Sequence, residues 1–272
     1  MIHWNASPEL ISFGPITIRW YGILFAAAFL LGFQIMQWIY KKEKRSVTEL
    51  DSLFMFMFIG TIVGARLGHC LFYDPAFYLS HPIEIFKIWK GGLASHGGAI
   101  GILLSLYFYT RKQGNLSYLW LLDRLAIPTA LGGTFIRIGN FMNSEIVGIP
   151  TNGWWAVVFE RVDMIPRHAV QLYEATAYGI VFIVLLLTYR SVGNKYRDGM
   201  LIGLFLILVF SARFLLEFVK TPQAAYNSGL TFSVGQLLSI PFVVIGLFLT
   251  VRSVLMSKNT GNVIEPPVVD EN

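Results

Sequence analysis

Seven long apolar segments restrict what this chain can fold into. They lie at about 18–40, 51–73, 94–110, 117–137, 169–190, 199–219 and 233–252. Apolar runs of roughly 18 or more residues predict helices that cross a bilayer. Hydrophobic residues make up 55% of the chain and charged residues only 14%, whereas soluble domains carry about a quarter charged residues. We therefore expect an all-α, polytopic membrane protein with about seven transmembrane helices, of which the third is the shortest.

Basic residues in the short loops predict the orientation of the chain. If seven spans are threaded alternately, one side receives Lys41, Lys42, Lys44, Arg45, Arg111, Lys112, Arg190, Lys195, Arg197, Arg252 and Lys258. The positive-inside rule then places the N-terminus outside and the C-terminus in the cytoplasm. The net charge of +5 therefore reflects topology and contact with anionic lipid, so we expect a bilayer partner and no nucleic acid.

The spans account for one domain. No internal repeat of the kind that marks many transporters is visible in the sequence. We expect residues 1–256 to form a single transmembrane domain, and residues 257–272, which are largely polar, to form a disordered cytoplasmic tail. No cluster of His, Asp and Glu has the spacing of metal ligands, so we expect no metal.

Two connections on the outer side are long enough to form structure of their own. Residues 74–93 combine an apolar cluster with Lys87 and Lys90, a pattern typical of a short helix that lies in the membrane interface. Residues 144–168 carry paired tryptophans, which suit the headgroup zone. We therefore expect interfacial structure, including short helices, at the outer ends of the spans.

A polar cluster closes the fourth apolar segment. Within nine residues, from Arg137 to Glu145, the chain gathers a guanidinium, the carboxamides of Asn140 and Asn143, and a carboxylate. Ionisable groups at membrane depth are costly, so they usually face a protein interior or a wet cavity and serve a function. Arginine presents five donors in a flat fork that suits phosphate. The cluster therefore indicates an anion site at the edge of a bilayer.

Other polar residues occupy the same ends of neighbouring spans. Arg66 shares one face of the second span with His69 and Tyr73. Arg213 and Glu217 are four residues apart and could pair within one helix. Each pattern could serve helix packing alone. Three further residues are interpreted as interhelical hydrogen-bond partners: Gln171, Glu174 and Gln236.

His96 stands out because five glycines surround it. Glycine permits close backbone approach, and Gly97 and Gly101 make a small face for a neighbouring helix. Histidine is also the side chain whose proton moves most easily near neutral pH. The alternatives of a packing residue and a catalytic residue both remain open for this imidazole.

Taken together, these residues indicate a lipid-handling protein. The predicted topology brings five of them toward the outer half of the bundle: Arg66, His96, Arg137, Asn140 and Arg213. Several uncompensated arginines in one bundle would repel each other unless an anion lay among them. The natural anion at that depth is the phosphate of a phospholipid.

The chain resembles the bacterial prolipoprotein diacylglyceryl transferase family over nearly its whole length. The resemblance rests on Ile18-Arg19-Trp20-Tyr21-Gly22, Gly64-Ala65-Arg66-Leu67-Gly68, His96-Gly97-Gly98, the Arg137 to Glu145 signature followed by Gly148, Pro166-Arg167-His168, Gln171-Leu172-Tyr173-Glu174, Arg213 with Glu217, and Gly235-Gln236. The signature Arg-x-Gly-Asn-Phe-x-Asn is specific, and it occurs here in a chain with seven expected spans.

Three positions depart from the common pattern of that family. Ile136 precedes the signature arginine where the family commonly has glycine, and Ser144 stands where it commonly has another. Val209 takes the place of a tyrosine that is often functional in the family, so no tyrosine role is carried over to this position.

The resemblance implies a catalytic transmembrane domain in the bacterial inner membrane. Its substrates would be phosphatidylglycerol and a preprolipoprotein whose lipobox cysteine accepts the diacylglyceryl group as a thioether, and it would use no cofactor. The implied catalytic residues are His96, Arg137 and Arg213. The implied phosphatidylglycerol contacts are Tyr21, Arg66, Arg137, Asn140 and Arg213, with supporting roles for Glu145, Gly148, Arg167 and Glu217.

Two other classes of function fit parts of the pattern. A transporter for an organic anion would use the arginines to select substrate, but it predicts repeats or broken helices that the sequence does not show. A phospholipid-binding protein without catalytic activity would need the arginines but would leave His96 without a chemical task.

Overall fold

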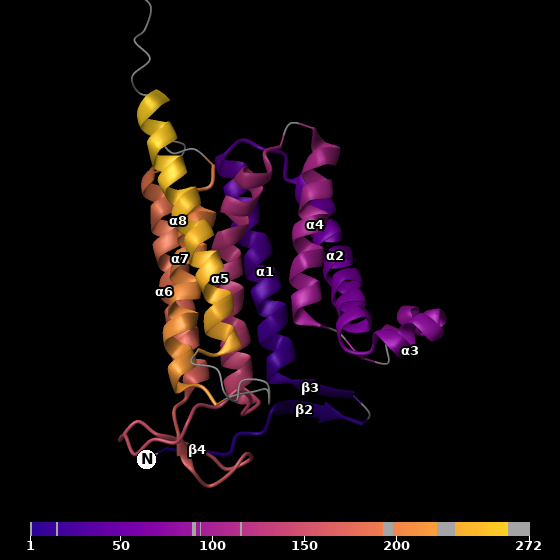
Figure 1. Ribbon diagram of the computed structural model, residues 1–272, viewed down its shortest axis with the longest axis vertical. Coiled ribbons are helices and arrows are strands. Elements are labelled where there is room, and N and C mark those ends of the chain that lie inside the picture. The colour runs from indigo at the N-terminus through magenta and orange to yellow at the C-terminus, as the bar shows by residue number, and fades with distance from the viewer. Residues whose placement is uncertain are drawn as a thin grey trace, which may run out of the picture. The chain divides into compact units, whose positions relative to one another are not determined.

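The computed structural model describes residues 2–14, 16–88, 91–92, 94–114, 116–192, 198–221 and 232–260 (Figure 1). These residues group into two compact units, which are described in turn below. One unit consists of Met1–Ile35 with Leu122–Asn272, and the other of Met36–Leu121. The expected cytoplasmic tail lies outside the described residues beyond position 260, where helix α8 ends.

All seven apolar segments contain a helix. The long helices are α1 (Trp20–Lys42), α2 (Thr48–Phe72), α4 (Ser95–Gln113), α5 (Tyr118–Met142), α6 (Val170–Val192), α7 (Met200–Leu216) and α8 (Val234–Thr260). Among the described residues, 6 helices are long and apolar enough to cross a membrane. One of these spans combines α7 with the short 3-10 helix η4 (Glu217–Val219) that follows it. The expectation of a helical multi-pass membrane protein is therefore confirmed. Helix α4 is not among these 6, because its glycines and polar residues lower its mean hydropathy.

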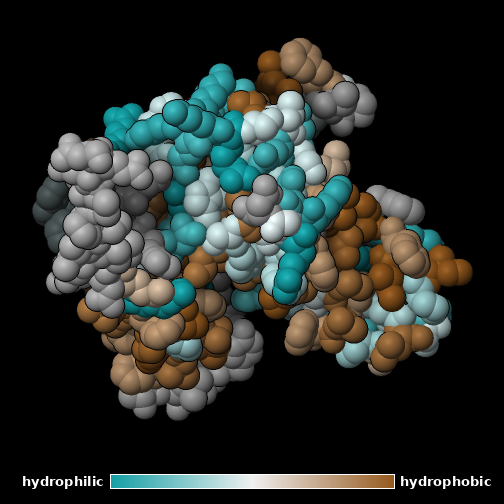
Figure 2. All heavy atoms as spheres, turned by 90° about the horizontal axis from the view of Figure 1, so that it is seen from above, coloured by the Kyte–Doolittle hydropathy of each residue, from teal (hydrophilic) through white to brown (hydrophobic). Residues whose placement is uncertain are grey.

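Large apolar side chains remain exposed along these helices. Phe58 of α2, Phe108 of α4 and Phe248 of α8 are each more than half exposed. In the view from above (Figure 2), hydrophobic residues cover much of the flanks, whereas hydrophilic residues gather on the end that faces the viewer. Soluble monomers rarely expose apolar surface of this extent. The exposed side chains therefore identify surfaces that face lipid.

In the unit Met36–Leu121, α2 and α4 pack against each other through glycine. A Cβ added at Gly64 would lie 2.7 Å from the Cα of Gly101, and one added at Gly68 would lie 2.7 Å from the Cα of Gly97. Residues four apart share one helix face, so the sequence spacing of these glycines produces a continuous contact between the two backbones. The contact runs antiparallel (Figure 1), and it places the N-terminal turn of α4 beside the C-terminal end of α2.

The connection from α2 to α4 contains two short helices, α3 (Pro75–Ser80) and the 3-10 helix η1 (Pro82–Phe86). A proline occupies the first position of each, where its missing N–H costs no hydrogen bond. Leu79 is 75% exposed and Phe86 is 77% exposed. Short helices in this connection agree with the sequence expectation, and their apolar surfaces suit a membrane interface.

In the other unit, short strands accompany the helices, which the sequence pattern did not predict. β1 (Ile2–Trp4) pairs in parallel with β4 (Val157–Phe159), and β4 pairs antiparallel with β5 (Pro166–Arg167). A separate hairpin joins β2 (Glu9–Phe13) to β3 (Ile16–Arg19). The three-stranded sheet packs onto the end of α5, because the ring of Phe141 lies 4.3 Å from Trp4 and 5.8 Å from Phe159, centroid to centroid.

A buried carboxylate at the opposite end of α5 fixes the start of α7. Asp123 is only 2% exposed, and its two oxygens accept the backbone N–H groups of Gly199 and Ile202, each at 2.8 Å. The first N–H groups of a helix have no partner within the helix, so Asp123 supplies the cap that the sequence just before α7 lacks. Nη1 of Arg124 lies 3.5 Å from Oδ1 of Asp198, and this ion pair is a second link between α5 and the segment before α7.

Asp123→Ala is expected to lower the free energy of unfolding by about 2–4 kcal/mol, because it leaves two helix-terminal N–H groups without their charged acceptor. Denaturant unfolding in detergent micelles measures the loss. Asp198→Ala is the matched control: the Asp198 side chain is 35% exposed and its loss leaves Arg124 beside Asp123, so it should cost less than about 1 kcal/mol. Equal losses for the two variants would contradict the capping role of Asp123.

Candidate functional site

A buried carboxylate, that of Glu174 on α6, holds two cations in the larger unit. Its side chain is 1% exposed, and its Oε2 lies 3.0 Å from Nε of Arg137 on α5. Its Oε1 accepts a hydrogen bond from Nζ of Lys220 at 2.7 Å. A charge at this depth is stable only when it is paired and hydrogen-bonded. The two cations therefore stabilise the buried charge of Glu174, and Glu174 in turn fixes the positions of both cations.

Backbone pairing places Lys220 over Glu174. Lys220 forms an isolated antiparallel bridge with Gly148, and the backbone N–H of Ile149 donates to the carbonyl of Val219 at 3.0 Å. A Cβ on Gly148 would lie 2.6 Å from a methyl of Val170 and 2.7 Å from Cβ of His168. Glycine at 148 is therefore required for the chain to pass between these segments.

The signature residues form a chain of hydrogen bonds at the end of α5. Nη1 of Arg137 donates to Oδ1 of Asn140 at 3.3 Å, and Nδ2 of Asn140 donates to Oε2 of Glu145 at 3.1 Å. Asn143 donates to the other oxygen of Glu145 at 3.2 Å, and Gln171 of α6 donates to the Glu145 backbone carbonyl. Glu145 thus ties the signature turn together, and Asn140 aligns the guanidinium of Arg137.

The backbone at the end of α5 explains the position where glycine is common in the resembled family. The N–H of Glu145 donates to the carbonyl of Asn140 and the N–H of Ser144 to that of Phe141, which is the Schellman arrangement of a helix C-terminus. Ser144 has φ +56°, the left-handed region that glycine enters without steric cost. The serine keeps the same turn with some strain, so this departure preserves the fold of the signature.

Tyr21 of α1 belongs to the same cluster. A Cβ on Gly139 would lie 2.7 Å from Cδ2 of the Tyr21 ring, so the ring rests on the glycine between Arg137 and Asn140. This close approach explains why the signature needs glycine at 139. The phenol therefore lies beside the side chains that the sequence assigned to an anion.

Arg167 supports the site from β5 through a bidentate contact. Its Nε and Nη2 donate to the carboxylate of Asp163, and its Nη1 donates to the carbonyl of Gly148 at 3.2 Å. Hydrogen bonding from Arg167 holds the pKa of the Asp163 carboxyl below its usual value. Glu145 therefore binds the signature loop, whereas Arg167 pairs with Asp163.

Arg213 and Glu217, expected as a possible pair within one helix, have different surroundings. Oε2 of Glu217 lies 3.6 Å from Nζ of Lys220, and a Cβ on Gly235 would lie 2.7 Å from Oε1 of Glu217. Within the described part of the chain no carboxylate forms an ion pair with Arg213, which is partly buried in α7. Arg213 is therefore a cation whose charge is available to a bound anion.

Gln236 anchors the start of α8 next to these residues. Its Oε1 accepts the N–H of Ser233 at 2.9 Å, while Ser233 Oγ accepts the N–H of Gln236 at 3.2 Å, the reciprocal pattern of a capping box. Nε2 of Gln236 also donates to the carbonyl of Phe214 on α7 at 3.3 Å. The expectation of an interhelical hydrogen bond at Gln236 is therefore confirmed.

Arg66 and His96 lie in the other unit, Met36–Leu121. The Arg66 guanidinium is 4% exposed and donates to four backbone carbonyls of the α2–α4 connection: Glu84 at 2.6 Å, Ile85 at 2.8 Å, Gly91 at 2.6 Å and Gly92 at 3.2 Å. Four of its five N–H groups are thereby engaged. His96 follows in the first turn of α4, where its imidazole is exposed.

The structure thus brings together one set of the expected site residues and leaves two in a separate unit. The larger unit gathers Tyr21, Arg137, Asn140, Glu145, Gly148, Arg167, Arg213 and Glu217. The central roles of Glu174 and Lys220 were not predicted from the sequence. Glu174 is interpreted there as an interhelical hydrogen-bond partner, and no local pattern distinguishes Lys220 from other basic loop residues. Among the described residues, no group of three or more His, Cys, Asp and Glu could hold a metal.

Comparison with known proteins gives one consistent result. The model of the prolipoprotein diacylglyceryl transferase family matches residues 8–252. The phosphatidylglycerol–prolipoprotein diacylglyceryl transferase of Tolumonas auensis is 58% identical over 253 residues, which cover 93% of this chain and 98% of the relative. Proteins of the same name from Chloroherpeton thalassium and Bacteroides fragilis are 53% and 42% identical, covering 93% and 91% of this chain and 94% and 93% of those relatives.

Glu174→Gln is expected to lower the free energy of unfolding by about 3–5 kcal/mol, because it keeps the shape of the side chain but leaves two buried cations without their shared countercharge. Chemical unfolding in detergent micelles measures the loss. Glu217→Gln is the matched control: its carboxylate is more exposed and farther from Lys220, so the same substitution should cost about 1 kcal/mol. A neutral Glu174→Gln variant would show that Glu174 does not organise the cluster.

Proposed function

Since the chain belongs to the prolipoprotein diacylglyceryl transferase family, we propose that it moves the diacylglyceryl group of phosphatidylglycerol onto the thiol of a lipobox cysteine in a preprolipoprotein. The observation that carries the proposal is the cluster around Glu174. It contains the signature residues Arg137 and Asn140, and in the same unit Arg213 of α7 carries a positive charge with which no described carboxylate forms an ion pair. A phosphodiester carries one negative charge and fits that requirement.

The reaction forms one bond and breaks one. The cysteine sulfur attacks the terminal glycerol carbon of the diacylglyceryl group, a carbon–sulfur bond forms, and the carbon–oxygen bond to phosphate breaks. Glycerol phosphate leaves with the electron pair, and the thiol proton passes to a base. These steps balance without an oxidant or a reductant, so no cofactor is part of the proposal.

His96 is proposed as the base that removes the thiol proton. A free thiol has a pKa of about 8.5, so only a few per cent is thiolate at neutral pH. An imidazole titrates near neutrality and can accept that proton. The exposed position of His96 in the first turn of α4 leaves its ring accessible to a substrate.

Arg137 and Arg213 are proposed to stabilise the negative charge that grows on the bridging oxygen as the carbon–oxygen bond breaks. Preorganised charge of this kind usually contributes most to catalysis. Glu174 and Asn140 hold the Arg137 guanidinium in one orientation, so little reorganisation is needed when charge develops. Tyr21, whose ring rests on Gly139, is proposed to contact the headgroup from the neighbouring helix.

The remaining residues are proposed to position these groups. Glu145 ties the signature turn, Arg167 binds the carbonyl of Gly148, and Glu217 neighbours Lys220. Arg66 was expected to bind phosphatidylglycerol, but its donors point at backbone carbonyls of the α2–α4 connection. We therefore propose that Arg66 positions the segment that leads to His96.

The proposal also fixes where the reaction occurs. Multi-pass membrane insertion follows from the six apolar helices and the family. If α4 is a seventh crossing, the distribution of Lys and Arg favours an N-terminus outside and a C-terminus in the cytoplasm. We therefore propose that the Glu174 cluster lies at the outer face of the bacterial inner membrane. The lipobox cysteine would reach it from that side, and nucleic acid has no part in the reaction.

The decisive experiment incubates the purified protein with phosphatidylglycerol and a synthetic lipobox peptide and follows the peptide by mass spectrometry. The expected product carries a diacylglyceryl thioether, and the matching peptide with serine in place of cysteine stays unmodified. A transporter or a lipid-binding protein would yield no adduct. Absence of the thioether from the wild-type reaction would therefore refute the proposed function.

His96→Ala is expected to reduce transfer by at least about 100-fold, because general base catalysis contributes on that scale or more. Raising the pH should restore part of the lost rate, since solvent then generates the thiolate. Full activity of the variant at neutral pH would remove His96 from the role of base. An unchanged melting temperature would show that the variant is folded.

Arg137→Lys is expected to lower kcat/KM by about 100-fold, because a point charge cannot bind Glu174, Asn140 and a phosphate oxygen in the geometry of the guanidinium fork. The transfer assay above measures the change. Arg161→Lys makes the same substitution at an exposed position and should leave the rate unchanged. Wild-type turnover by Arg137→Lys would show that the fork is not used.

A further inference from the structure

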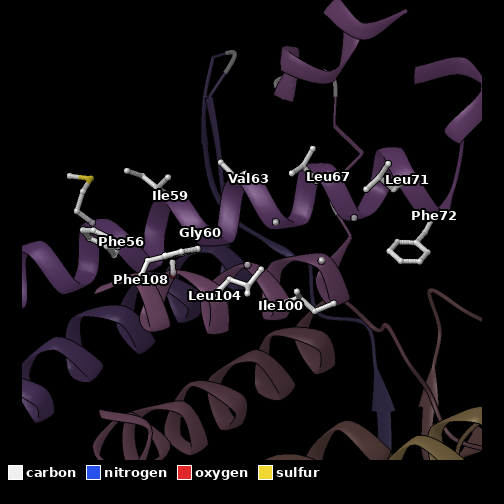
Figure 3. Close-up of a pocket in the computed structure, with 16 residues that line it drawn as sticks. Phe56, Ile59, Gly60, Val63, Leu67, Leu71, Phe72, Ile100, Leu104 and Phe108 are labelled. Atoms are coloured by element: carbon white, nitrogen blue, oxygen red, sulfur yellow. The ribbon is translucent and has the colours of Figure 1, made fainter. Parts of the chain in front are cut away.

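A long apolar groove runs along α2 and α4 in the unit Met36–Leu121. Figure 3 shows side chains of both helices lining it, with Val63 and Leu71 from α2 and Ile100 and Leu104 from α4. The glycine contact described above forms its floor, because the two backbones approach closely there and leave no side chains in between. The only polar side chain in its lining, Ser105, donates its hydroxyl to the carbonyl of Ile102 at 2.9 Å. The groove therefore offers an apolar surface with no unpaired polar group.

The dimensions of the groove select what fits it. Its volume is about 520 Å³, and its lining extends on α2 from Met55 to Phe72, a length of about 25 Å at the rise of an α-helix. A peptide helix of that length and about 10 Å across occupies roughly 2,000 Å³, far more than the groove holds. A single acyl chain fits the groove, whereas a transmembrane helix does not.

One end of the groove lies next to the proposed base. Gly97 lines it and directly follows His96, whose imidazole is exposed in the first turn of α4. Gly68 and Leu71 of α2 line the same end. One leaflet of a bilayer contributes about 15 Å of hydrocarbon, which reaches from Phe72 to about the depth of Val63, nine residues away. A chain seated in this half of the groove would leave its glycerol end at His96.

We propose that the half of the groove nearest His96 holds one acyl chain of the diacylglyceryl group during transfer. The proposal rests on the transferase function above and adds a subsite to it. Seating the chain there would fix the depth of the glycerol carbons relative to the imidazole, so that the cysteine attacks beside its base. It follows that the rate of transfer depends on the length of the acyl chain when that chain reaches the depth of Val63.

A bulky side chain at the depth of Val63 tests the subsite. Val63→Trp fills the groove from α2, and Ile100→Trp fills it from α4 at a similar depth, since Gly101 faces Gly60 and Gly64. An octanoyl chain, which is half as long as a palmitoyl chain, ends before this depth, whereas a palmitoyl chain reaches it. Both variants should therefore lose at least about tenfold in kcat/KM with dipalmitoyl phosphatidylglycerol in mixed micelles, while the rate with dioctanoyl phosphatidylglycerol changes less than about twofold.

Val251→Trp is the matched control, because Val251 is 54% exposed on α8 and Val63 is 49% exposed on α2. It adds the same bulk to a lipid-facing helix outside the groove and should leave the ratio of the two rates at the wild-type value. Equal losses with both donors, or an unchanged ratio in Val63→Trp and Ile100→Trp, would overturn the subsite. If one of the two variants folds poorly, the ratio of the rates with the two donors can still be measured in the other variant. A wild-type protein without transferase activity would instead refute the function on which the subsite rests.

Discussion

Pairing of a buried carboxylate with two cations is the interaction on which the rest of the polar site depends. Glu174 lies on α6, Arg137 on α5 and Lys220 just beyond α7, so one side chain connects three helical segments. In a medium with little water, removing Glu174 leaves Arg137 without its ion pair and Lys220 with only the more distant Glu217. The same arrangement orients the Arg137 guanidinium toward Asn140 and the signature turn. Structure and proposed catalysis therefore share one electrostatic requirement.

Hydropathy alone located the helices, because a bilayer requires long apolar segments whose backbone groups are paired internally. The strands β1, β4 and β5 could not be found in this way. Each is only two or three residues long, and β1 pairs with a segment more than 150 positions away in the sequence. Pairings of such short segments depend on the packing of Trp4, Phe141 and Phe159, which no local pattern encodes.

Part of the candidate site could be predicted from the sequence, because charged and amide side chains at membrane depth usually serve a function. Arg137, Asn140 and Glu145 fall within one helix end, so their proximity followed from the spacing. Glu174 and Lys220 are separated by 46 positions, and a glutamate with a glutamine in the same span is equally consistent with helix packing. Arg66 shows the opposite case, because its charge predicted a ligand and the structure directs it to backbone carbonyls instead.

The glycine contact between α2 and α4 limits how this region of the gene can change. Every single-nucleotide change in a glycine codon that alters the amino acid introduces at least a methyl group. At Gly64, Gly97 and Gly101 that methyl would meet backbone atoms of the facing helix, which have no alternative rotamer to adopt. Tolerance at these positions therefore requires a second change that separates the helices. Such a change would also widen the floor of the groove, so the stability of the helix pair and the thickness of the chain it can seat must vary together.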